Sequence, residues 1–168
     1  MVKAGRTEVI KIMALQYLPI LTKRSAPKPP RELRPITKVA WHPLQRSLAE
    51  MRIALITSGA IRERNQQSFP PLGDASYRLV TSDPTFTDLQ VDHRTRSGLS
   101  ARKDPEVAFP RLAMKTLVTQ GLVGDIPPCH FSVYGGISDY SDIEETLAPE
   151  LADHLTRGRV DLAVLLPF

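Results

Sequence analysis

Two apolar runs decide the fold of this chain: RIALITSGA at residues 52–60 and VDLAVLL at residues 160–166. Both are short, rich in branched aliphatic residues and poor in charge, which is typical of strands buried on both faces. Such strands belong to parallel sheets, and a parallel pair requires a long crossover connection, usually a helix. The order of strands and helices between the two runs therefore indicates an α/β fold.

Further elements are predicted between these runs. Residues 77–80 (YRLV) favour a short strand, and residues 126–136 are too rich in Pro and Gly for a helix. Helical spacing predicts two helices, one with Leu112, Leu117 and Val118 and one with Ile143, Leu147, Leu151 and Leu155. Glycines 121 and 124 end the first helix, Ser141 or Asp142 caps the start of the second, and Gly158 lies at its end. We expect residues 41–168 to form an incomplete, doubly wound, Rossmann-like parallel sheet, truncated after its last strand.

Positive charge is concentrated in residues 1–40. This segment holds nine Lys or Arg and two acidic residues, whereas residues 41–168 hold thirteen basic and sixteen acidic residues. Helical spacing of apolar residues between Val9 and Leu18 predicts an amphipathic helix, followed by a Pro-rich linker. We expect this basic arm to dock on its own domain or on a partner subunit. Contact of residues 1–24 with an anionic membrane surface is the weaker alternative.

The composition excludes several classes of function. One cysteine excludes a disulfide framework within the chain and any cysteine pair for zinc or redox chemistry. No apolar run reaches the roughly 18 residues of a spanning helix, so we expect a cytoplasmic protein. The basic residues at 94–103 have no interleaved aromatic rings, and nucleic acid is not an expected partner. No cofactor motif is evident, and the acids at 139–145 resemble the first turn of a helix more than a metal site.

Three segments carry candidate substrate-binding and acid–base residues. Thr57, Ser58 and Gly59 follow a buried strand and could offer backbone N–H groups to an anion, although a plain turn is the simpler interpretation. His93 could act as a general base oriented by Asp92, or it could face solvent. Adjacent residues of an extended chain point to opposite faces, which weakens a pairing of His93 with Asp92.

The segment at 129–135 supplies the remaining candidates. A protonated His130 could lower the pKa of the Cys129 thiol and activate it as a nucleophile. Consecutive side chains rarely face each other, so a reactive Cys129 is the least favoured hypothesis. His130 with Tyr134 and Gly135 could instead line a pocket, the alternative being a loop packed by its own rings.

Eight short segments of the chain, taken together in their order along the sequence, carry a resemblance to a known family. They are residues 41–44 (WHPL), 52–60, 77–80, 91–93 (VDH), 109–112 (FPRL), 121–124 (GLVG), 130–135 (HFSVYG) and 160–167. In this order and with similar spacing, they resemble the selenoprotein B family of the glycine, betaine and sarcosine reductases, which includes the selenoprotein subunit of D-proline reductase. The resemblance runs from about Trp41 to Phe168.

This resemblance implies reductive cleavage of a C–N bond by a subunit that works with other reductase subunits. In that family a selenocysteine, or a cysteine in many relatives, directly follows the last strand seen here and attacks the substrate. The sequence ends before that position, so we expect an N-terminal portion in which His93 and His130 contribute to a pocket completed by the missing thiol or selenol. The alternative is a non-catalytic or vestigial subunit that binds a partner protein or a second copy of itself.

Overall fold

The structure, a computed structural model, describes residues 42–71, 74–137 and 141–168. The predicted basic arm and linker, residues 1–40, lie outside the described residues. In chain order the elements are η1 (Leu48–Glu50), β1 (Ile53–Thr57), β2 (Ile61–Glu63), β3 (Tyr77–Thr81), β4 (Leu89–Val91), α2 (Arg96–Lys103), η2 (Pro105–Val107), α3 (Arg111–Thr119), β5 (Cys129–Val133), η3 (Ile143–Leu147), α4 (Ala148–Arg157) and β6 (Leu162–Leu166). None of the described helices is long and apolar enough to cross a membrane.

The α/β class is confirmed, and the main sheet has the strand order β3-β5-β1-β6. Strands β1 and β6 are parallel, as predicted, with Ile53 of β1 opposite Leu162 of β6, and the unpredicted strand β5 also runs parallel to β1. The expectation of a wholly parallel sheet is wrong for β3, which runs antiparallel to β5. An apolar run predicts that a strand exists, but the path of the chain through space decides its direction. A separate antiparallel ribbon of β2 and β4 was not predicted.

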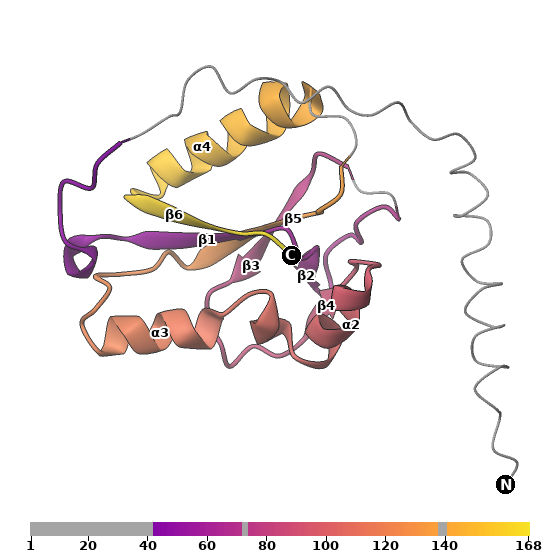
Figure 1. Cartoon of the computed structure of the whole chain (residues 1–168), viewed down its shortest axis with the longest axis horizontal. Coiled ribbons are helices and arrows are strands. Elements are labelled where there is room, and N and C mark those ends of the chain that lie inside the picture. The colour runs from indigo at the N-terminus through magenta and orange to yellow at the C-terminus, as the bar shows by residue number, and fades with distance from the viewer. Residues whose placement is uncertain (1–41, 72–73, 138–140) are drawn as a thin grey trace, which may run out of the picture. The chain divides into compact units, whose positions relative to one another are not determined.

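Helices cover both faces of the main sheet, with α4 on one side and α3 on the other (Figure 1). Side chains of β1 alternate between these two layers, because successive residues of a strand point to opposite faces. Leu55 packs in the core on the α3 side with Met114, whereas Ile56 packs with Phe131 and Leu151 on the α4 side. The sheet is therefore doubly wound within the described residues, and its central strands are buried on both faces.

The largest departure from the sequence analysis is β5, which occupies the irregular segment at 126–136. His130 and Ser132 of this strand are fully buried although both are polar. Their side chains satisfy backbone groups of neighbouring segments: His130 Nδ1 accepts from the N–H of Leu55 at 3.3 Å, and Ser132 Oγ accepts from the N–H of Ile61 at 2.7 Å. Polar residues that serve as internal hydrogen-bond acceptors hide the apolar pattern of a buried strand.

Both predicted helices are present. Helix α3 ends before Gly121, whose φ of +69° reverses the chain in a conformation that favours glycine. The second helix begins with a π-helical segment, η3, and continues as α4 to its C-cap residue Gly158. Leu147 and Leu151 of this helix are buried against the sheet, as the helical spacing predicted.

Candidate functional site

The crevice at the carboxyl ends of β1 and β5 is where the topology favours a ligand site. These strands are neighbours, yet the connection from β1 to β5 includes α3, whereas the connection from β5 to β6 is made by η3 and α4 on the opposite face of the sheet (Figure 1). In open α/β sheets, ligands bind at such a switch point, outside the carboxyl ends of the strands. The residues at this point are Ser58 and Gly59 after β1 and Tyr134 and Gly135 after β5, and an isolated bridge joins Gly59 to Tyr134.

Two polar side-chain atoms converge on Gly135 in this crevice. A Cβ at position 135 would lie 3.2 Å from His93 Nε2 and 3.3 Å from Ser58 Oγ. The N–H of Gly135 donates to the carbonyl of Ser58 at 2.9 Å, which fixes the two chain segments side by side. Gly135 therefore allows a close approach that a larger residue would block, and it leaves an imidazole nitrogen and a hydroxyl facing the same small volume.

His93 is held from three sides. Its ring stacks on Tyr134 with ring centroids 5.5 Å apart, and the ring of Phe168 meets it edge-on at 5.8 Å. Thr95 Oγ1 is hydrogen-bonded to His93 Nδ1 at 2.8 Å. Only 5% of the residue is exposed, which excludes the solvent-facing alternative for His93. Burial, with a further contribution from the charge of Arg102, lowers the pKa of His93. The imidazole is therefore neutral at pH 7 and able to accept a proton.

Backbone contacts fix the loop that carries His93. Arg102 of α2 donates from Nη2 to the carbonyl of His93 at 3.1 Å and from Nε to the carbonyl of Val91 at 3.2 Å. Gly98 lies so close that a Cβ there would be 2.3 Å from the His93 carbonyl oxygen. These contacts connect α2 to the end of β4, so His93 does not depend on its own side chain for its position.

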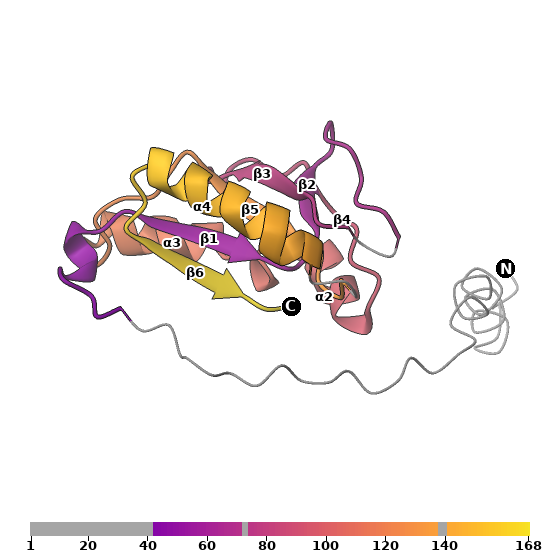
Figure 2. The same ribbon diagram turned by 90° about the horizontal axis from the view of Figure 1, so that it is seen from above.

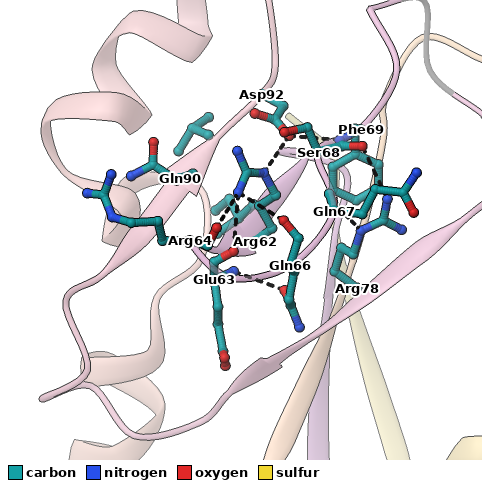
Figure 3. A network of polar contacts seen from close by, with 12 residues as sticks. Arg62, Glu63, Arg64, Gln66, Gln67, Ser68, Phe69, Arg78, Gln90 and Asp92 are labelled. Atoms are coloured by element: carbon teal, nitrogen blue, oxygen red, sulfur yellow. Dashed lines mark hydrogen bonds and ion pairs between the residues drawn. The ribbon is translucent and has the colours of Figure 1, made fainter.

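Asp92 does not pair with His93, so the hypothesis that Asp92 orients the imidazole is wrong. Asp92 Oδ2 accepts from Arg62 Nε and from the N–H of Phe69, each at 2.8 Å (Figure 3). Its carboxylate therefore points away from the imidazole, as the alternation of an extended chain requires. Thr95, and not Asp92, is the residue hydrogen-bonded to His93.

The turn after β1 contributes a side chain and not its backbone. The N–H groups of Ser58, Gly59 and Ala60 donate to Leu166 O, Thr57 Oγ1 and Val133 O, at 3.1, 3.1 and 3.0 Å. Thr57 is itself fully buried, and its hydroxyl donates to the carbonyl of Ala108. These three N–H groups are thus engaged within the chain, which matches the simpler interpretation as a plain turn. Ser58 Oγ accepts from the N–H of Phe168 at 2.8 Å, and its own proton can still be donated to a ligand.

Two of the candidates lie away from this crevice. His130 is fully buried on the α3 side, where Phe109 meets its ring edge-on and its Nε2 has no hydrogen-bond partner within the described structure. Burial, helped by the charge of Arg111, lowers the pKa of His130 to about 4. Cys129 is the first residue of β5, at the opposite end of the strand from Gly135. Burial and the charge of Glu63 raise the pKa of its thiol, opposite to the shift that a reactive thiolate requires.

The structure thus gathers five of the proposed residues, Ser58, Gly59, His93, Tyr134 and Gly135. It adds Thr95, Arg102 and Phe168, which sequence reasoning missed. No local pattern marks these three residues, because their partners lie on other elements. Within the described ranges, no group of three His, Cys, Asp or Glu side chains is arranged to hold a metal ion. A hollow of about 210 Å³ beside Asp83, Lys115 and Asp125 lies at the other end of the sheet and contains none of the proposed residues.

Comparison with known proteins relates the chain to one enzyme subunit. The chain is similar to the D-proline reductase subunit gamma of Acetoanaerobium sticklandii, with 32% identity over 126 residues. The matched region covers 75% of this chain and 52% of that protein, so the chain spans about half the length of this relative. No protein-family model matches the chain, and no solved structure matches it.

Proposed function

We propose that this chain is part of a reductase subunit related to D-proline reductase, and that the crevice at Gly135 binds the substrate. Similarity to a named reductase subunit supports the class of enzyme. The observation that carries the site is the convergence of His93 Nε2 and Ser58 Oγ on Gly135, at the switch point of the sheet.

The proposed reaction is the reductive cleavage of a C–N bond in glycine, betaine, sarcosine or D-proline. The C–N bond breaks, one hydrogen is added to the carbon and one to the nitrogen, and the two electrons come from a dithiol or selenol–thiol pair that is oxidised. In this scheme the neutral imidazole of His93 exchanges a proton with the bound substrate, and the hydroxyl of Ser58 donates a hydrogen bond to it. Tyr134 and Phe168 shield the imidazole from water. We also propose that the chain works together with other reductase subunits and that it is located in the cytoplasm.

The reducing group must come from outside the crevice, because Cys129 is the only cysteine of this chain and lies at the far end of β5. This observation also favours the second candidate function, a non-catalytic subunit that binds a ligand or a partner without turning over substrate. The two functions share the crevice and differ in whether a thiol or selenol is delivered to it.

A binding experiment tests the site without requiring turnover. The full chain is labelled with ¹⁵N-histidine and titrated at pH 7.5 with D-proline, glycine, betaine and sarcosine, while the imidazole resonances are followed by NMR. We expect at least one of the four compounds to shift the His93 signals with saturation. The Gly135→Ala variant, which fills the point of convergence, should weaken that binding by at least about 10-fold, or 1.4 kcal/mol.

Cys129→Ser is the matched control, because it changes a half-buried side chain on the same strand at the end remote from the crevice. We expect it to leave the affinity unchanged. If none of the four compounds moves the His93 signals, the proposed site is wrong. Loss of binding in Cys129→Ser with normal binding in Gly135→Ala would instead place the ligand at the other end of the strand.

A further inference from the structure

The two ring nitrogens of His93 lie in different surroundings. Nδ1 is hydrogen-bonded to Thr95 Oγ1 at 2.8 Å. Nε2 lies 3.2 Å from where a Cβ of residue 135 would stand and makes no hydrogen bond to the described residues. The buried side-chain atoms that lack a partner in the described part of the chain are Glu106 Oε1, Arg111 Nε and His130 Nε2. Because His93 Nε2 is not among them, it keeps contact with solvent and is the nitrogen that a ligand can reach.

Thr95 fixes which edge of the imidazole faces the crevice. The stack on Tyr134 holds the plane of the ring, but a half turn about the Cβ–Cγ bond leaves that plane unchanged and exchanges the ring nitrogens with ring carbons. The hydrogen bond to Thr95 distinguishes the two orientations, since only a nitrogen can make it. Thr95 is the N-cap residue of α2, which lies beyond the carboxyl end of β1 (Figure 2). Its position beside the ring is therefore set by the helix.

A hydroxyl can either accept from Nδ1 or donate to it, and the choice decides what Nε2 can do. If Thr95 accepts from Nδ1–H, Nε2 carries a lone pair, and if Thr95 donates to Nδ1, Nε2 carries the proton. Thr95 is exposed, so water can receive its proton while its oxygen accepts. The arrangement with Nδ1–H also stays bonded when Nε2 gains a proton, because an imidazolium donates from both nitrogens. It therefore suits the proton exchange at Nε2 that the proposed function requires.

We propose that Thr95 is the positioning residue of the crevice: it accepts from Nδ1–H of His93, and Nε2 in turn accepts a hydrogen bond from a ligand amine that bears an N–H. This inference rests on the proposed function and narrows its class of ligand. A quaternary ammonium has no N–H and leaves Nε2 without a donor in a largely desolvated site. Glycine, sarcosine and D-proline therefore fit the crevice, and betaine does not.

The tautomer of His93 tests the role of Thr95 without any ligand. The full chain is labelled with ¹⁵N-histidine, and the protonated ring nitrogen is identified at pH 7.5 from the ¹⁵N shifts and their couplings to the ring protons. Comparison with His93→Gln assigns the signals among the four histidines. We expect a protonated Nδ1 and an unprotonated Nε2. Thr95→Val should raise the Nε2–H form to at least about half of the population, since Nδ1 loses its acceptor, and Thr95→Ser should keep the wild-type signals.

A matched pair of ligands tests the class of amine. N,N-Dimethylglycine and betaine differ by one methyl group, and only dimethylglycine has an N–H. We expect dimethylglycine to bind at least about 10-fold more tightly, the difference expected for one charge-assisted hydrogen bond. Thr95→Val should reduce this preference to about 2-fold or less, whereas Thr95→Ser should retain it.

Thr116→Val is the matched control, because it removes a threonine hydroxyl that donates within α3 to the carbonyl of Leu112. It should change neither the tautomer of His93 nor the preference between the two ligands. Far-UV circular dichroism verifies that each variant is folded.

Three results would overturn the proposal. The first is an Nε2–H tautomer in the wild-type chain. The second is a Thr95→Val variant with the tautomer and the preference of the wild type. The third is equal binding of betaine and dimethylglycine, which would leave the proposed function intact. If none of the compounds binds, the proposed function fails and the class of ligand fails with it, and the tautomer alone then decides the role of Thr95.

Discussion

The two edges of the main sheet differ in whether side chains bond to their outward backbone groups. At the β3 edge, the outward N–H of Thr81 donates to Glu63 Oε1 at 3.1 Å, and the outward carbonyl of Leu79 accepts from Gln66 Nε2 at 2.7 Å. Arg78 completes the cover, with bonds to the carbonyls of Gln67 and Ser68 (Figure 3). At the β6 edge, the described residues provide no such cover.

This difference shows that side chains can close a sheet edge without adding a strand. The cover comes from the last residue of β2 and the segment after it, which Arg62 holds by donating to the carbonyls of residues 63, 64 and 66. Side chains bonded to the N–H of Thr81 and the carbonyl of Leu79 occupy backbone groups that a second strand would otherwise bond. The edge of β6 has an apolar sequence and, among the residues that the structure describes, no side chain that bonds to its outward backbone groups.

The largest expected effect is a loss of stability at low pH, caused by His130 of β5, a strand that lies between the two edges. His130 of β5 is neutral when folded, with a pKa of about 4 against 6.5 in the unfolded chain, so the unfolded state binds the extra proton. The free energy of unfolding is therefore highest above pH 6.5, and it falls by about 3 kcal/mol as the pH decreases toward 4. His93 acts in the same direction. Urea unfolding at pH 7 and pH 4.5 measures the loss.

The His130→Asn variant separates this effect from general acid sensitivity. It should reduce the pH dependence by most of that amount, whereas His93→Gln should reduce it less. An unchanged slope in His130→Asn would mean that other groups control acid unfolding, and that β5 is not the acid-sensitive element between the edges.

Removal of Asp92 should loosen the closed edge. The ion pair of Arg62 and Asp92 is only 12% and 19% exposed, and Asp92 also accepts from the N–H of Phe69. Asp92→Ala leaves Arg62 Nε and this N–H without their acceptor, and we expect a loss of about 2 kcal/mol in the free energy of unfolding. Asp88→Ala is the matched control, since its pair with Arg64 is largely exposed and should cost less than about 0.5 kcal/mol. Equal effects of both variants would contradict the assigned role.

The smallest expected effect comes from substitution of Glu63, whose carboxylate accepts a hydrogen bond from the outward N–H of Thr81 in β3. Glu63→Ala should cost about 1 kcal/mol and speed hydrogen exchange of the Thr81 amide. Glu63→Gln keeps an acceptor oxygen and should restore most of the protection. If Glu63→Ala leaves the exchange of Thr81 unchanged, side-chain cover is not what protects this edge.

Much of the fold follows from local patterns. The apolar runs at β1 and β6 and the helical spacing of Leu147 and Leu151 predict buried elements, because burial imposes a period on each element separately. His93, Tyr134 and Gly135 could be proposed as site residues from their chemistry alone. Strand β5 could not be predicted this way, since His130 and Ser132 gain their place in the core from acceptor roles toward β1 and β2.

The sequence by itself determined the α/β class, the two central apolar strands and the faces of the helices, because these depend on the spacing of neighbouring residues. Tertiary structure decided the direction of β3, the pairing of Asp92 with Arg62 and the meeting of Ser58 with His93 at Gly135. It also decided which edge of the sheet is closed. Each of these depends on contacts between residues far apart in the chain, whose partners no local pattern can specify.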